Sequence, residues 1–285
     1  MSSTLKEIRQ GVAQDLNELT LGTISTAPST TTFTSYDLVD SIEDDEAYEG
    51  AWVRIVSGAT ANTERRIASF EQASGEATVT LSRLWTSPDL SAEFEIHKAM
   101  PGGDLNTLIN RAISGLTYET NQAITVVAGQ VAYSLAAYTW LTKRQQVWDV
   151  EWRDYDATYG SRYVPLPWFD VVDVSGTLYL LLKQSYGATG DYLYLRCWRH
   201  YDEFDVTDDT DTTDCPEDWL RAATVCAVYE WQMERAPGED AKRIGEKLKR
   251  AEAKRLLKTL AYIPRPNTRT MHKDSGLFSG SYGGV

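Results

Sequence analysis

Histidine and cysteine are the residue types that hold transition metals or act as nucleophiles, and this chain has three of each. The histidines stand in separate segments, at His97, His200 and His272. The cysteines form no CxxC pair and lie at Cys197, Cys215 and Cys226. Zinc sites are marked by closely spaced ligands, so this spacing predicts no metal site. An odd number of thiols without a pair is typical of a reducing compartment.

Seven carboxylates crowd the stretch DEFDVTDDTDTTD, residues 202–214. Alternating aspartates supply the oxygen ligands that Ca²⁺ prefers, but the stretch lacks the loop glycine and the distal glutamate of an EF-hand. We therefore favour a solvated acidic connection in which Asp214 caps the next helix, and we leave Ca²⁺ binding open.

Pairs of carboxylates among aromatic rings are what a glycoside hydrolase needs: an acid, a base or nucleophile, and a stacking platform. The pairs here are Asp154 with Asp156 and Glu151 with Asp170. The rings around them are Trp148, Trp152, Tyr155, Tyr159 and Trp168. Such rings are equally typical of protein interfaces, so sugar cleavage, sugar binding and protein contact remain alternatives for this region.

The best-marked catalytic motifs are absent from the sequence. It contains no GxSxG elbow, no P-loop and no GxGxxG turn, which mark acyl transfer, NTP hydrolysis and dinucleotide binding. We therefore expect a non-catalytic protein that needs no cofactor.

Charge divides the chain into two parts. The whole chain carries a formal charge of −13, whereas residues 239–285 alone carry +6, so residues 1–238 sum to −19. Tight binding of DNA or RNA needs basic residues at the phosphates, so we expect no specific nucleic-acid contact. The sequence also shows no signal peptide and no apolar run of membrane-spanning length, so we expect synthesis in a cytoplasm and no membrane partner.

Apolar periodicity predicts the elements that position these residues. Three- and four-residue steps indicate helices at the N-terminus, with Thr4 and Glu7 as a capping box and Gly22 as a stop, and after PGGD, with Asp104 as the cap. Period-two runs between Trp52 and His97, and again after residue 122, indicate β structure.

Two helices of opposite character are predicted near the C-terminus. The first begins after Pro216 and is apolar on most of its circumference, which is typical of a buried helix. The second, near 239–261, is a charged strut with i,i+4 pairs Glu239/Arg243 and Glu246/Arg250. The tail that follows is rich in glycine and proline, so we expect it to be extended and to order only on a partner.

The sequence therefore predicts an α+β fold. A small antiparallel β-barrel and an aromatic-rich β-sandwich-like domain are joined to a helical core of about four helices, with an extended C-terminal arm. The predicted ranges are 1–22 for the N-terminal helix, 33–100 for the barrel, 101–118 for the connecting helix, 122–206 for the second β domain, 214–261 for the C-terminal helix pair and 262–285 for the arm.

Three stretches resemble proteins from the neck of tailed bacteriophages. GAW (50–52), ERRI (64–67) and FEIHK (94–98) resemble parts of the β module of many phage virion proteins. PGGDLNTLINRAISGL (101–116) is similar to the helix that often follows it, and the terminal helix pair with its arm resembles head-to-tail adaptors. Many adaptors are shorter and mainly helical, so the extra β domain departs from that pattern.

The resemblance implies a virion structural protein of the neck, assembled in the host cytoplasm. It implies a ring of twelve copies between the portal protein and a tail or neck protein, through which DNA passes without specific binding. The arm would grip the portal through Arg265, Arg269, Lys273, Leu277, Phe278 and Tyr282. Candidate subunit-interface residues are Trp219, Leu220, Tyr229, Trp231, Ile244 and Leu248. The alternative functions are a tail or baseplate component that binds or cleaves carbohydrate, and an interaction module unrelated to viruses.

Overall fold

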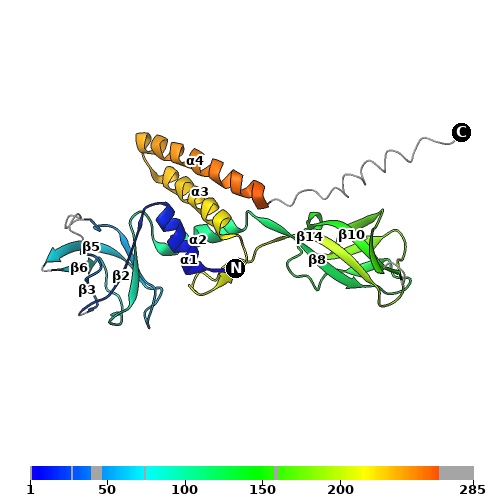
Figure 1. Ribbon diagram of the computed structural model, residues 1–285, viewed down its shortest axis with the longest axis horizontal. Helices are drawn as coiled ribbons and strands as arrows, with labels where there is room; N and C mark the ends of the chain where they lie inside the picture. The colour runs from blue at the N-terminus through cyan, green and yellow to red at the C-terminus, as the bar shows by residue number, and fades with distance from the viewer. Residues whose placement is uncertain (1, 27, 40–46, 74, 157–159, 263–285) are drawn as a thin grey trace. The chain divides into compact units, whose positions relative to one another are not determined.

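The computed structural model describes residues 2–26, 28–39, 47–73, 75–156 and 160–262. These residues form four α-helices and several antiparallel sheets, so the predicted α+β class is confirmed in its broad form (Figure 1). The chain divides into two compact units. Unit 1 comprises Met1–Gly115 with Tyr201–Tyr262, and the described part of unit 2 is residues 116–156 and 160–200.

Unit 1 contains a six-stranded antiparallel sheet in the order β2-β7-β4-β5-β6-β3. Its strands are β2 (Leu19–Thr23), β3 (Thr32–Ser35), β4 (Trp52–Ile55), β5 (Glu64–Ala73), β6 (Glu76–Leu81) and β7 (Glu93–His97). The two edges meet at an isolated bridge between Thr26 and Thr34, and no continuous ladder closes a barrel among the described residues. The inner face of the sheet is filled by aromatic and branched side chains, including Phe33, Phe70 and Phe94.

Helix α1 (Leu5–Asp15) is shorter than the helix predicted over 1–22. The capping box is confirmed, because Thr4 Oγ1 accepts from the Glu7 backbone N–H at 3.2 Å. The helix ends because Asn17 turns the chain with a φ of 58°. Gly22 is not a helix stop: it lies in β2, where a Cβ atom would come within 2.6 Å of the Phe94 ring.

Helix α2 (Gly102–Ile113) is capped from outside its own sequence. Asp104 was predicted as the cap, but it lies in the first turn, and Pro101 is the N-cap without a side-chain bond. The Glu64 carboxylate of β5 accepts from the backbone N–H groups of Gly102 and, at 3.2 Å, Gly103. A negative charge at this position also matches the positive end of the helix dipole.

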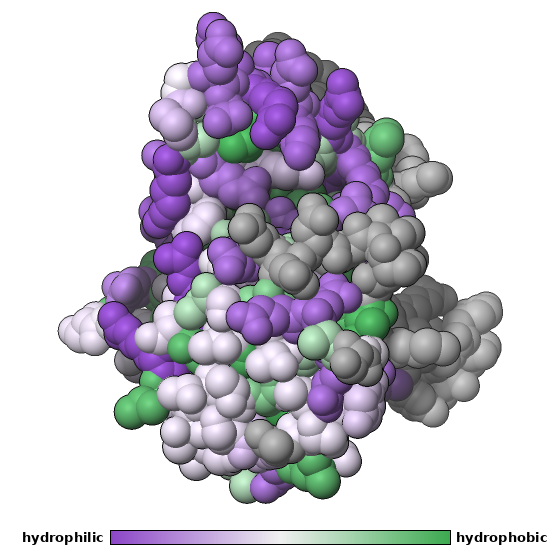
Figure 2. All heavy atoms as spheres, turned by 90° about the vertical axis from the view of Figure 1, so that its left-hand side faces the viewer, coloured by the Kyte–Doolittle hydropathy of each residue, from purple (hydrophilic) through white to green (hydrophobic). Residues whose placement is uncertain are grey.

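Helices α3 (Glu217–Arg235) and α4 (Gly238–Tyr262) form a hairpin and run side by side (Figure 1). Pro216 is the N-cap of α3, so Asp214 does not cap this helix. On the exposed side of α4, Arg243 pairs with Asp240 at 3.6 Å, and neither predicted i,i+4 pair forms. Figure 2 shows hydrophilic side chains gathered at the top of the molecule, where Figure 1 places the turn between the two helices.

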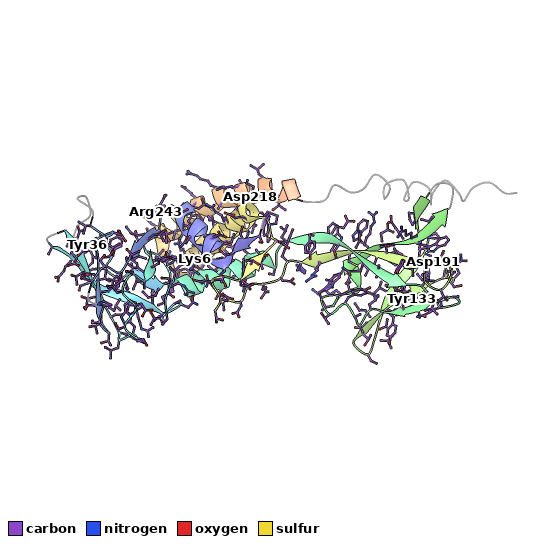
Figure 3. All side chains as sticks on the ribbon, turned by 60° about the horizontal axis from the view of Figure 1, so that its bottom comes forward. Lys6, Tyr36, Tyr133, Asp191, Asp218 and Arg243 are labelled. Carbon is purple, nitrogen blue, oxygen red and sulfur yellow. The ribbon has the colours of Figure 1, made fainter. Side chains whose placement is uncertain are left out.

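Unit 2 consists of two antiparallel sheets that share one hydrophobic core. The first has the order β11-β10-β14-β8, from β8 (Thr117–Thr125), β10 (Val147–Asp156), β11 (Gly160–Pro165) and β14 (Tyr192–His200). The second has the order β12-β13-β9, from β9 (Ala132–Ser134), β12 (Phe169–Val174) and β13 (Thr177–Leu182). Tyr133, labelled in Figure 3, is among the buried residues of this core. Strand β8 begins at Thr117, inside the range 101–118 that was predicted as a helix. Pairing with β14 stabilises these residues as a strand.

A fully buried arginine connects the parts of unit 1. Arg9 of α1 donates from Nε and Nη2 to the Glu95 carboxylate of β7 at 2.8 and 3.0 Å. It donates from Nη1 and Nη2 to Asp209 at 2.6 and 2.8 Å. Arg9 Nη1 also reaches Asn106 Oδ1 of α2 at 3.2 Å, and Arg54 Nη2 of β4 donates to Asp209 at 3.1 Å. The acidic connection is therefore attached to the helices and the sheet through buried charges.

The ionisation of these groups is fixed by their mutual contacts. Burial disfavours each charge, but hydrogen bonds to Asp209 and Glu95 raise the pKa of Arg9 above its ordinary value. Burial also opposes ionisation of Glu95, but bonds from His97 and Arg9 lower its pKa to about 2. The pKa of Asp209 is lowered in the same way by Arg9 and Arg54, against the effect of burial.

We predict that Arg9→Met strongly destabilises unit 1, because two buried carboxylates lose their main counter-charge. Removing one partner of a buried ion pair costs about 3–5 kcal/mol. Urea unfolding followed by circular dichroism measures the change in free energy. Arg83→Met is the matched control, because Arg83 is exposed and forms no ion pair with the described residues, and its effect stays within about 0.5 kcal/mol. Equal stability of the two variants would refute the structural role of Arg9.

We also predict that acid weakens the fold through Glu95 and Asp209. Their folded-state pKa values lie below the ordinary 4.5 and 3.8, so their contribution is present above those values and is lost as pH falls toward about 2. The melting temperature measured in steps between about pH 6 and pH 2 should fall steeply in this window. In Arg9→Met the melting temperature should fall less steeply with pH. An equally steep fall in the variant would contradict the role given to Glu95 and Asp209.

Candidate functional site

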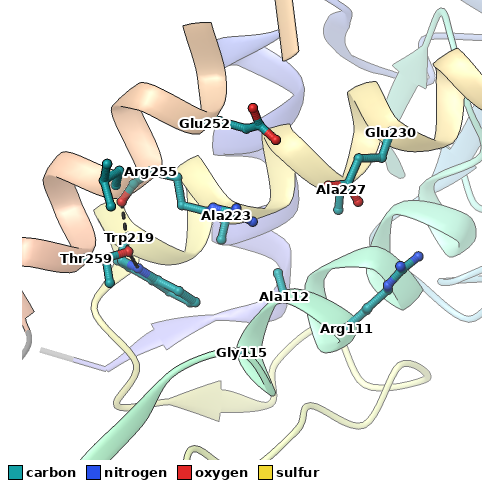
Figure 4. A pocket seen from close by; sticks show the side chains of 11 residues that line it. Arg111, Ala112, Gly115, Trp219, Ala223, Ala227, Glu230, Glu252, Arg255 and Thr259 are labelled. Atoms are coloured by element: carbon teal, nitrogen blue, oxygen red, sulfur yellow. Dashed lines mark hydrogen bonds between the residues drawn. The ribbon is translucent and has the colours of Figure 1, made fainter. Parts of the chain in front are cut away.

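A groove of about 520 Å³ opens between α2, α3 and α4 in unit 1 (Figure 4). Its lining residues come from all three helices and from Gly115, which follows α2: Arg111, Ala112, Gly115, Trp219, Ala223, Ala227, Glu230, Glu252, Arg255, Leu256 and Thr259. Three packed helices supply a rigid frame for it, because the α3 and α4 hairpin and the α2–α3 contact both lie within one unit.

Small side chains make the groove possible. Ala112 of α2, Gly115 just after that helix, and Ala223 and Ala227 of α3 line the groove, so large side chains do not separate the backbones here. Trp219 fills one end of the groove, and its Nε1 donates to Thr259 Oγ1 of α4 at 2.8 Å. That bond satisfies the indole N–H and fixes the ring against the fourth helix.

The rim of the groove carries charges of both signs and includes the exposed Leu256, which is followed in α4 by a second exposed leucine, Leu257. Arg111 and Arg255 lie on the rim with Glu230 and Glu252. The leucines are consecutive on α4, and Leu256 is 59% and Leu257 69% exposed. Exposed apolar side chains beside a concave surface are a feature that many protein-docking sites share.

The predicted interface residues separate into two groups in the structure. Trp219, Leu220 and Leu248 are buried within unit 1, where they form part of its own packing. The other three are half-buried, at Tyr229, Trp231 and Ile244. Arg235 lies 4.1 Å from the centre of the Trp231 ring, and Lys247 lies 5.9 Å from that of Tyr229. Sequence reasoning did not select Leu257, which at 69% is the most exposed apolar side chain among those described in α4.

The predicted portal-binding residues lie outside the described residues. They are Arg265, Arg269, Lys273, Leu277, Phe278 and Tyr282. Their role stays a prediction.

The carboxylates of unit 2 are engaged in local bonds where the structure describes them. Glu151 is buried and pairs with Arg196 at 3.1 Å, and that guanidinium lies 5.6 Å from the Trp148 ring centre. The Asp170 side chain accepts from the Val171 backbone N–H at 2.8 Å. The side chains of Asp154, Tyr155 and Asp156, and all of Tyr159, lie outside the described residues. Trp152 packs against the core and Trp168 is 47% exposed.

The acidic connection 202–214 is organised by its own turns. Asp205 accepts from Thr207, which lowers the pKa of Asp205 below its usual value, and Asp208 accepts from Thr210 at 2.7 Å. Asp209 is occupied by Arg9 and Arg54. Within the described residues no three His, Cys, Asp or Glu side chains are arranged to hold a metal ion. Of the histidines, His97 lies 2.9 Å from Glu95, and His272 is outside the described residues.

We predict that the three thiols are unreactive in the folded protein. Burial raises the pKa of Cys197 and Cys215 to about 12 and that of Cys226 to about 11, and all three side chains are buried. Only the thiolate reacts with Ellman's reagent, so at pH 8 the native protein should react at least about 100-fold more slowly than the unfolded protein. The same titration in denaturant should give three thiols per chain. Rapid reaction of one native thiol contradicts this arrangement.

None of the helices in the described residues combines the length and apolar composition needed to cross a bilayer. No protein-family model matches this chain, and no curated protein matches it. Its function is therefore inferred from the geometry of its own surfaces.

Proposed function

We propose that this chain is a non-catalytic virion structural protein, a head-to-tail adaptor that forms a ring between portal and tail. The observation that carries the proposal is the groove of α2, α3 and α4 with the exposed Leu256 and Leu257 beside it. Exposed apolar residues at a concave, small-residue floor are stabilised by burial against another protein.

The groove suits a protein side chain better than a small polar ligand. Its floor presents alanine and glycine, whose small size lets a neighbouring backbone approach closely. Its rim carries two arginines and two glutamates. Such charges fix how a partner is oriented, and they add less to the strength of binding. In the proposed ring, a helix or loop of an adjacent copy covers Leu256 and Leu257.

The charge distribution supports a role around DNA that does not grip it. The net charge of −13 repels a duplex, so a ring of such subunits would let DNA pass with little adhesion. The cationic residues of segment 262–285 would dock on the portal, with the small apolar residues of the same segment as anchors. In this proposal the subunit is assembled in the host cytoplasm and resides in the neck of the virion.

The architecture of each unit has a place in this proposal. The six-stranded sheet, whose edges meet at the Thr26–Thr34 bridge, acts as a small β-barrel module, and the two sheets of unit 2 act as a sandwich-like domain. A ring of twelve copies has cyclic symmetry, which requires two different complementary faces on each subunit. The groove is proposed as one of these faces.

We predict that Leu256→Ser/Leu257→Ser preserves folding but prevents ring formation on the portal. Both side chains are more than half exposed, so their replacement should change the free energy of unfolding by no more than about 0.5 kcal/mol each. The purified variant is mixed with its portal protein, and the complexes are imaged by electron microscopy.

Deletion of 263–285 separates ring contacts from portal attachment. The truncated chain should fold normally but no longer attach to the portal. Leu90→Ser in the β module is the matched control for the leucine variant, because Leu90 is 60% exposed and lines neither the groove of α2, α3 and α4 nor a second groove on the β module. Normal rings from the leucine variant, together with normal attachment of the truncated chain, would refute the adaptor proposal.

A further inference from the structure

A second groove, of about 640 Å³, lies on the β module of unit 1 and is rich in arginine. It is lined by Trp52, Glu64, Arg65, Arg66, Ser82, Arg83 and Leu84. Three arginines on one small surface are unexpected here, because residues 1–238 carry a net charge of −19. We call this surface the arginine groove.

Intramolecular bonds leave most of the guanidinium donors in the arginine groove free. Arg65 donates from Nε to Leu84 O at 3.0 Å and from Nη1 to Glu64 O at 2.6 Å. Arg66 donates from Nε to Gly50 O at 3.1 Å. Each guanidinium has five N–H donors, so several remain on each residue. None of Arg65, Arg66 and Arg83 forms an ion pair with a carboxylate of the described residues.

The one carboxylate in the arginine groove does not neutralise it. Both Glu64 oxygens face the first turn of α2, where they accept from the Gly102 and Gly103 N–H groups. The glutamate charge is thus directed at the positive end of a helix. The groove therefore presents an excess of positive charge to a ligand.

Apolar surface in the arginine groove distinguishes a peptide from a bare anion. Leu84 is 69% exposed, and the half-buried Trp52 lies across the β4 and β5 pair opposite Arg66. An aromatic ring and a leucine beside guanidinium groups fit a segment that carries both carboxylates and side-chain carbon. A free phosphate would contact only the arginines.

We propose that the arginine groove binds an acidic peptide segment of a second copy of this chain, the connection 202–214. Five carboxylates of that connection are exposed at its surface: Asp202, Glu203, Asp205, Asp208 and Asp214. Arginine pairs with carboxylates through two parallel hydrogen bonds, which gives both strength and geometric selectivity. This inference rests on the proposed ring, in which the arginine groove and the acidic connection are two different faces that meet between copies.

The test uses a fluorescent synthetic peptide, DEFDVTDDTDTTD, titrated with the full-length protein and followed by anisotropy. We expect saturable binding that weakens as NaCl is added, and at least about a tenfold loss of affinity in Arg66→Glu/Arg83→Glu. A peptide with every Asp and Glu replaced by Asn and Gln should not bind. The matched control is Lys143→Glu/Arg144→Glu, which makes the same change in net charge at exposed residues of unit 2 and should bind the peptide as the natural chain does.

Folding of the variants is checked separately by thermal unfolding. Arg83→Glu alone keeps the test valid if the double variant unfolds, because the Arg83 side chain is exposed. Absence of peptide binding, or equal loss of affinity in the groove variant and the control, overturns the inference.

A nucleic-acid occupant is the other outcome of this test. If a mixed-sequence DNA duplex binds the natural chain and loses affinity in Arg66→Glu/Arg83→Glu while the peptide does not bind, the groove is a phosphate site and the inference is wrong. Because peptide binding requires no portal, a failure of ring assembly on the portal with intact peptide binding would count against the proposed function alone.

Discussion

The buried charge of Arg9 is the constraint on which the organisation of unit 1 depends. A guanidinium removed from water is tolerated only when carboxylates and hydrogen-bond acceptors surround it. Glu95 comes from the sheet, Asp209 from the acidic connection and Asn106 from α2, so satisfying one residue brings three distant segments together. The α3 and α4 hairpin follows that connection directly, so the groove of helices is built on an anchored segment.

Local patterns in the sequence predicted most of the helices and strands. They did not predict which residues of different elements contact one another. The Thr4 and Glu7 capping box is a three-residue pattern, and it was predicted correctly. The partners of Arg9 lie 86 and 200 residues away, so an arginine on a short amphipathic helix gave no sign of burial. The cap of α2 is similar, because Glu64 precedes Gly102 by 38 residues. Competition between helix and strand at Leu19–Thr23 was decided by pairing with β7, which is also non-local.

The candidate groove was only partly predictable for the same reason. Leu248 was predicted at a subunit interface, but the structure buries it and leaves Leu256 of the same helix 59% exposed. The difference depends on where α3 and α2 end relative to α4, which the spacing within α4 does not encode. In the sequence, nothing distinguishes the small residues of the groove from other helix-forming alanines and helix-ending glycines. They are Ala112, Gly115, Ala223 and Ala227. They form the floor of the groove only because three helices meet there.

Unit 1 contains buried arginines, which stabilise its fold, and exposed arginines, whose charge is not neutralised within the described residues. Arg9 and Arg54 are buried, so the cost of desolvation requires them to use nearby carboxylates fully. Arg66 and Arg83 are exposed, so water satisfies them and no internal carboxylate is needed. A strongly acidic chain offers many carboxylates, yet none of those described reaches these two side chains within ion-pair distance. Their charge is consequently available to another molecule, and the buried network holds the β module in the form that displays it.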